Sequence, residues 1–72
     1  MIKPGIYRHY KGKQYEVINS AFHSETLEEM VVYKALYTSE FGENCFWVRP
    51  LSMFMEKVDL EGKLVDRFRY EE

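Results

Sequence analysis

Apolar and β-branched residues occur in short runs along this chain, separated by turn residues about every ten positions. This spacing is typical of a small sandwich or barrel and not of helices. The first two runs, Gly5–Tyr10 and Gln14–Ile18, flank Lys11-Gly12-Lys13, where a glycine can take the positive φ that a tight turn requires. The chain is therefore expected to begin with an antiparallel hairpin.

A second hairpin is predicted in the middle of the chain. Met30–Tyr37 and Cys45–Arg49 are rich in β-branched and aromatic residues, and the segment 38–44 between them is polar with one glycine. These two runs should pair. Pro50 cannot donate a hydrogen bond to a sheet, so we expect the strand to end there.

In the last third of the chain, the residue pattern predicts a helical turn followed by two extended runs. Leu51–Phe54 should form the helical turn and Met55–Leu60 the first extended run. Glu61-Gly62-Lys63 then turns the chain into a strand over residues 64–70. Ser24–Glu29 is harder to interpret, because Thr26-x-x-Glu29 matches a capping box while the residues that follow favour a strand. At most one helical turn fits there.

These elements predict an all-β fold. We expect a five- or six-stranded antiparallel sheet, either an SH3-like or another partly open barrel, with one or two short helical turns. Seventy-two residues can enclose one core, so the prediction is a single domain over residues 1–72. Hydrophobic residues make up 46% of the chain, including six Tyr, five Phe and one Trp. Large rings, Trp47 above all, should supply much of the core.

Charge and cysteine content narrow the classes of function. The formal net charge is −2, and only residues 1–19 are clearly basic, with four basic side chains and one acidic. This balance argues against nucleic-acid binding, which depends on clustered Lys and Arg. Cys45 is the single cysteine, which excludes an intramolecular disulfide and a Cys-based zinc cage. There is no apolar run of signal-peptide or membrane-helix length, so a cytoplasmic protein without membrane contact is predicted.

His23-Ser24-Glu25 places a base, a nucleophile and a carboxylate side by side. Catalytic triads are assembled in space, however, and consecutive extended residues point to opposite faces. The alternative is that Ser24 and Thr26 close a turn around a partly buried His23. The two histidines match no metal-ligand spacing and the glycines form no phosphate-binding motif, so neither a metal nor another cofactor is predicted.

Two segments place an arginine beside aromatic rings at the end of a strand. They are Tyr7-Arg8-His9-Tyr10 and Trp47-Val48-Arg49-Pro50. A guanidinium can bind a carboxylate or phosphate while an aromatic face stacks on a planar group. The alternative is that the rings belong to the core and that Arg8 or Arg49 pairs with Glu56 or Glu25 across the sheet.

Several blocks of the sequence together resemble a known family. They are YRHYKGKQYEVI, A-x-HSETLE, VVYKALY, FWVRP, MFMEKV and a closing RF, which lie between Gly5 and Phe68. The chain resembles a family of short bacterial proteins known only as a domain of unknown function. The resemblance implies no activity. It marks His23-Ser24-Glu25-Thr26 and Trp47-Val48-Arg49-Pro50 as characteristic segments without assigning them roles.

The leading hypothesis is a non-enzymatic binding module for a small anionic or planar ligand or a protein segment. We expect the two characteristic segments to converge on one face of the barrel. A small hydrolase or transferase with His23 as general base is the alternative, and a structural homodimer that covers aromatic surface is a further one. The candidate ligand-binding residues are Arg8, His23, Glu25, Tyr33, Trp47 and Arg49.

Overall fold

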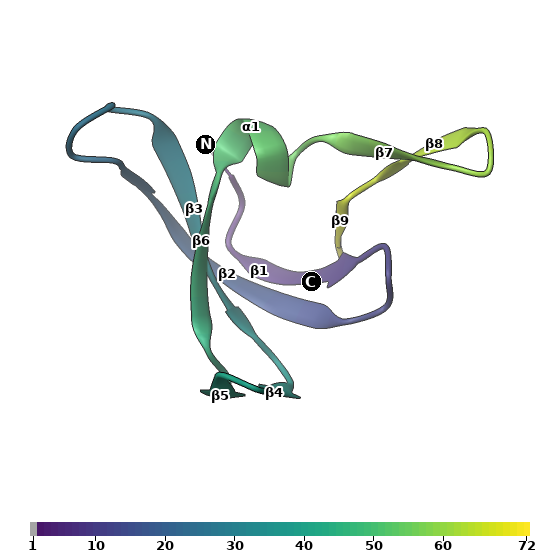
Figure 1. Ribbon diagram of the computed structural model, residues 1–72, viewed down its shortest axis with the longest axis horizontal. Coiled ribbons are helices and arrows are strands. Elements are labelled where there is room, and N and C mark those ends of the chain that lie inside the picture. Colours follow the sequence, from purple (N-terminus) through teal and green to yellow (C-terminus); the bar gives the residue numbers. More distant parts are fainter. Residues whose placement is uncertain (1) are drawn as a thin grey trace.

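Five antiparallel strands form the main sheet of the computed structural model, which describes residues 2–72 (Figure 1). Their spatial order is β6-β3-β2-β1-β9. The sheet is open, because β6 and β9 are its two edge strands. The all-β prediction is thus confirmed. The strands are β1 (Gly5–His9), β2 (Gln14–Phe22), β3 (Glu29–Ala35), β6 (Phe46–Pro50) and β9 (Phe68–Tyr70).

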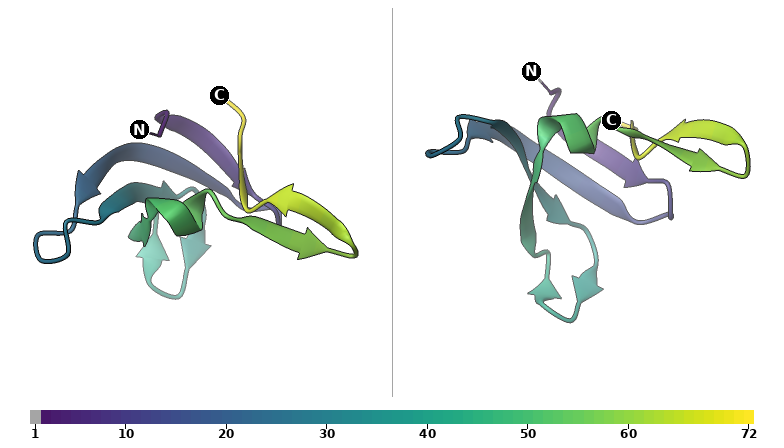
Figure 2. Two further views of the ribbon diagram at one scale, coloured as in Figure 1. Left: turned by 90° about the horizontal axis from the view of Figure 1, so that it is seen from above. Right: turned by 45° about the horizontal axis from the view of Figure 1, so that its top comes forward.

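Two short hairpins and one helical turn complete the fold. Strands β4 (Thr38–Ser39) and β5 (Gly42–Glu43) pair within the connection from β3 to β6. Helix α1 (Leu51–Phe54) follows β6, and β7 (Lys57–Leu60) then pairs with β8 (Lys63–Asp66). Figure 2 shows the β4–β5 and β7–β8 hairpins projecting from different parts of the sheet. No helix within residues 2–72 is long and apolar enough to cross a membrane.

The local predictions for the two hairpins and the helical turn are confirmed. β1 pairs with β2, and Gly12 in the turn between them has a φ of +105°. β3 pairs with β6, with β4 and β5 inserted in the polar connection. The strand ends at Pro50 and the helical turn covers Leu51–Phe54, as predicted. These elements depend on residues close in sequence, which is why sequence patterns identify them.

The expected strand at the end of the chain was wrong. Residues 64–70 do not form one strand, because the strand breaks at Arg67, whose N–H donates to the carbonyl oxygen of Glu56 at 3.2 Å. The part before the break pairs with β7 and the part after it with β1. The capping-box match at Thr26 and Glu29 does not begin a helix, which agrees with the expectation of at most one helical turn there. Thr26 Oγ1 accepts a hydrogen bond from the Glu28 N–H at 3.2 Å, and Leu27 has a φ of +62° that ends any helical path.

The core lies between one face of the sheet and α1. The helical turn brings Phe54 onto this face, where its ring stacks on that of Phe68 with centroids 4.0 Å apart and planes 2° apart. Trp47 packs against this core from a partly buried position, so it is not the central ring that its size suggested. The buried side chains of the cluster are those of Tyr7, Val17, Val31, Tyr33, Phe54 and Phe68.

Candidate functional site

A cavity of about 340 Å³ opens between the β1–β2 turn, β9 and the β7–β8 hairpin. We call it the hairpin groove. Its volume lies at the lower end of the range of small-molecule sites, about 300–1,000 Å³. Leu60 and Val65 of the β7–β8 hairpin supply apolar wall, and Asp66 is paired with Lys57 at 2.8 Å. The lining residues are Arg8, His9, Tyr10, Gly12, Leu60, Val65, Asp66 and Arg69.

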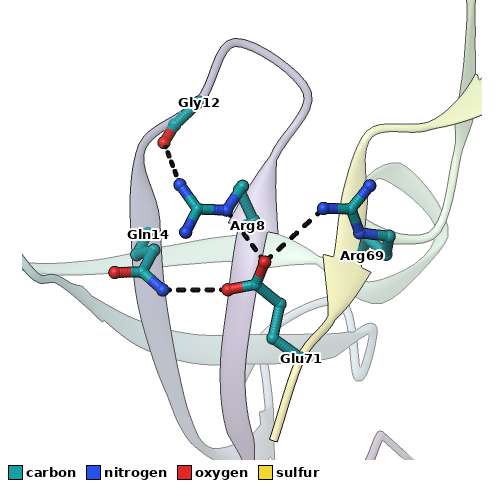
Figure 3. Close-up of polar contacts among 5 residues, drawn as sticks. All are labelled: Arg8, Gly12, Gln14, Arg69 and Glu71. Atoms are coloured by element: carbon teal, nitrogen blue, oxygen red, sulfur yellow. Dashed lines mark hydrogen bonds and ion pairs between the residues drawn. The ribbon is translucent and has the colours of Figure 1, made fainter.

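Arg8 and Arg69 are direct partners in the register between β1 and β9, so their side chains leave the sheet on the same face (Figure 3). Arg8 Nε donates to Glu71 Oε2 at 2.8 Å, and Arg69 Nη2 lies 3.5 Å from the same oxygen. Gln14 Nε2 donates to the other carboxylate oxygen of Glu71 at 2.8 Å. A single carboxylate therefore contacts both guanidinium groups, which leaves this cluster with a net positive charge.

The hydrogen bonds around Glu71 keep it ionised and hold Arg8 in place. The bond from Arg8 is the main reason that the pKa of Glu71 is lowered, and the bond from Gln14 is the second. Arg8 also donates through Nη1 to the carbonyl oxygen of Gly12 at 2.7 Å. Its guanidinium is thus tied both to the β1–β2 turn and to the segment after β9. The position of this charge at the groove is set by the fold.

The rings of His9 and Tyr10 also belong to the groove lining, with centroids 4.6 Å apart and planes tilted by 31°. His9 lies on the face of β1 opposite Arg8, and its ring centroid is 4.9 Å from that of Phe68. His9 Nδ1 accepts a hydrogen bond from the Lys11 N–H at 3.1 Å, so on the neutral imidazole the proton is carried by Nε2. Burial is the main reason that the pKa of His9 is lowered, and the charges of Arg49, Arg67 and Lys11 add to the effect. The ring is therefore neutral at pH 7.

Three of the residues predicted for the site lie together on the core face instead. Tyr33 is buried, and its register partner Trp47 faces the same side of the sheet. Arg49 Nε donates to the Tyr33 hydroxyl at 3.3 Å, and its guanidinium carbon lies 5.5 Å from the centre of the Phe68 ring. Within residues 2–72, Arg49 has no carboxylate within 4.0 Å, and the indole N–H of Trp47 is buried without a hydrogen-bond partner.

The suggested ion pairs of Arg8 or Arg49 with Glu56 or Glu25 are not formed among the described residues. Glu56 pairs with Arg67 at 2.7 Å, and Arg8 pairs with Glu71. Glu71 lies just after β9, 63 positions from Arg8 in the sequence. Neither arginine contacts Glu25 in the part of the chain that the structure describes.

His23 and Glu25 lie in the turn between β2 and β3, and both are exposed. The expectation of a partly buried His23 was wrong. Its Nδ1 accepts the backbone N–H groups of Glu25 at 3.1 Å and Thr26 at 3.3 Å. No hydrogen bond joins His23 to the Ser24 hydroxyl within residues 2–72. The imidazole thus organises the turn, as Asn and Asp side chains commonly do.

Metal-ligating side chains are also dispersed. In the part of the chain that the structure describes, no three His, Cys, Asp or Glu side chains are grouped so that they could hold a metal ion. Cys45 is half-buried at the start of β6, with its Sγ 3.7 Å from the carbonyl oxygen of Phe46.

Of the two groove arginines, Arg8 was among the candidate residues predicted from the sequence and Arg69 was not. Arg69 reaches the groove only because β9 pairs with β1, and these strands are about 60 positions apart in the chain. A local pattern contains no such information. Tyr10 carried a signal, because it stands two positions after Arg8 in the arginine-aromatic segment.

Comparison with known proteins supports this description of a small all-β domain with an open sheet. A family described as "Protein of unknown function (DUF1653)" matches residues 5–70. A crystal structure of a DUF1653 protein from Bordetella bronchiseptica is 38% identical, covers 97% of this chain and 87% of that one, and superposes with a TM-score of 0.87. No curated protein matches the chain. The chain belongs to the DUF1653 family, as its sequence blocks indicated.

Proposed function

We propose that this protein is a non-enzymatic binding module whose hairpin groove holds a small planar anion of the nucleoside monophosphate type. One observation carries the proposal. Arg8 and Arg69 face the same cavity from neighbouring strands, and a single carboxylate serves both of them.

An anionic group can bind at Arg69, beside the Glu71 carboxylate that lies between the two guanidinium groups. Arg69 is the freer of the two, since its side chain is 69% exposed and its contact with Glu71 is long, at 3.5 Å. A phosphate can therefore bind Arg69 while Arg8 keeps its bonds to Glu71 and Gly12. The carboxylate of Glu71 competes for the same donors, which keeps the affinity moderate.

A planar group fits the remaining lining. His9 and Tyr10 contribute rings to the groove lining, and Leu60 and Val65 contribute apolar surface from the hairpin. A base stacked on a protein ring contributes about 1–3 kcal/mol in single-strand binding proteins. Because His9 is neutral at pH 7, its Nε2–H is a hydrogen-bond donor and not a second charge.

Thermal shift with AMP, adenosine and ribose 5-phosphate tests this proposal. AMP should raise the melting temperature more than adenosine or ribose 5-phosphate does, because only AMP has both a planar base and a phosphate group. A ligand at 100 times its Kd stabilises a protein by about 2.7 kcal/mol. An equal response to all three compounds, or no response to any, would contradict the proposal.

Variants of exposed cations locate the effect. Arg69→Gln should abolish the shift with AMP and leave the melting temperature of the free protein nearly unchanged, since its ion pair is exposed. Lys63→Gln is the matched control, because Lys63 lies on β8 and is not part of the groove lining. A loss of binding in both variants would indicate nonspecific attraction of anions instead of a site.

A further inference from the structure

Strand β6 is an edge of the main sheet, and its outer side pairs with no other strand in the part of the chain that the structure describes (Figure 1). The hydrogen bond from the Ala35 N–H to the Cys45 carbonyl fixes the pattern of its pairing with β3. In an antiparallel pair, alternate residues exchange backbone hydrogen bonds. The backbone N–H and C=O groups of Trp47 and Arg49 therefore bond to β3. Those of Phe46 and Val48 point outward.

The side chains of Phe46 and Val48 are also unprotected. They lie on the sheet face opposite the core and are 63% and 61% exposed. Natural edge strands are usually blunted by a charged side chain, a bulge or a covering segment. Here Pro50 blunts only the last position, because it lacks an N–H.

We propose that β6 pairs with β6 of a second copy of this chain, antiparallel across a two-fold axis. The register places Phe46 opposite Val48 of the second copy, with the two Trp47 residues at the axis. In this register all four outward backbone groups of each copy find partners and Pro50 is left out of the ladder. Shifting it to place Val48 opposite Val48 sets Phe46 against Pro50, so that the Phe46 carbonyl has no donor.

Side-chain chemistry favours a copy of the same strand. Phe46 and Val48 of one copy cover Val48 and Phe46 of the other, and such aromatic and β-branched cross-strand pairs each contribute about 0.2–1 kcal/mol. A two-fold contact of this kind is isologous and closed.

Sedimentation equilibrium tests the pairing. Four strand hydrogen bonds and four apolar side chains make a small interface, so a weak dimer is expected over about 10 µM to 1 mM. Val48→Lys should raise the dimer Kd at least about tenfold by placing two like charges at the interface. Leu64→Lys is the matched control, because Leu64 is 70% exposed on β8 and should have no effect. A monomer throughout the range, or equal effects of both variants, would overturn the proposal.

Amide hydrogen exchange gives a second readout that does not depend on a variant. The N–H groups of Phe46 and Val48 should exchange rapidly in dilute solution and become protected at high concentration. Those of Trp47 and Arg49 should be protected at both, since β3 already binds them. A dimer that forms without protecting Phe46 and Val48 would show that another surface mediates it. Neither result depends on ligand binding at the hairpin groove.

Discussion

Arg8 and Arg49 stand in similar sequence surroundings, next to aromatic rings at the end of a strand, but the fold uses them in different ways. Arg8 faces the hairpin groove, where its guanidinium bonds to Glu71 and to the Gly12 carbonyl. Arg49 faces the core, where its guanidinium lies over the Phe68 ring and donates to Tyr33. Of these two arginines, only Arg8 has a carboxylate partner among the described residues.

Strand alternation explains the difference. Arg8 follows Tyr7, which is buried, so Arg8 must point to the opposite face of β1. Arg49 is the register partner of Val31, which is fully buried, so it shares the core face. The same residue type in the same local pattern is therefore a ligand-binding candidate in one strand and part of the core packing in the other. The face of the sheet decides the role.

Removing the Phe68 ring, which lies beneath the Arg49 guanidinium, should destabilise the protein most. Phe68→Ala removes the stack with Phe54 and the surface on which the Arg49 guanidinium lies. We expect a loss of about 3–5 kcal/mol in the free energy of unfolding, measured by urea titration. Tyr10→Ala, in the groove, should lose under about 1.5 kcal/mol, as is usual for residues outside a core. Similar losses in both variants would remove the distinction between the two regions.

Replacing Arg49 should lower the free energy of unfolding slightly more than replacing Arg8 does. Arg49→Ala should reduce the free energy of unfolding by about 1–2 kcal/mol, through loss of the hydrogen bond to Tyr33 and the contact with Phe68. Arg8→Ala should lose up to about 1 kcal/mol, because its ion pair with Glu71 is partly exposed. Chemical denaturation of both variants decides the order. If Arg8→Ala is the more damaging change, the Glu71 cluster is mainly structural.

The smallest effect is a pH dependence. The folded-state pKa of His9 is lowered from 6.5, first by burial and then by Arg49, Arg67 and Lys11. The unfolded chain therefore binds a proton at higher pH than the folded chain, so stability falls as the pH drops below about 6.5 and the fall ends below the folded-state pKa. His9→Gln should flatten this part of the profile in urea titrations across that range. An unchanged profile would show that His9 is not desolvated.

The sequence could predict the hairpins, the helical turn and the all-β class because each depends on neighbouring residues. It could not predict the break at Arg67 or the pairing of β9 with β1, since nothing near residues 64–70 specifies a partner 60 positions away. Arg69 could not be predicted as a groove residue for the same reason, because it reaches the groove only through the pairing of β9 with β1. Tyr33, Trp47 and Arg49, three of the six candidate residues, lie together on the core face.

His23 shows another limit of sequence reasoning. A histidine beside a serine and a glutamate suggests a base, yet the imidazole accepts two backbone N–H groups of its own turn. That role depends on the path of the backbone, which includes the positive φ of Leu27. The order of residue types in His23-Ser24-Glu25 does not predict this backbone path. The expected convergence of His23 with Arg49 has no support in the contacts of either residue.

An NMR titration of the ¹⁵N-labelled protein with AMP tests the proposed function most directly. If AMP binds in the groove, the amide signals of His9, Tyr10, Gly12 and Arg69 should shift, and those of Trp47 should stay in place. Ribose 5-phosphate should move the Arg69 signal far less. Shifts centred on Trp47 and Arg49, or none at millimolar AMP, would contradict the assignment of the groove as the binding site.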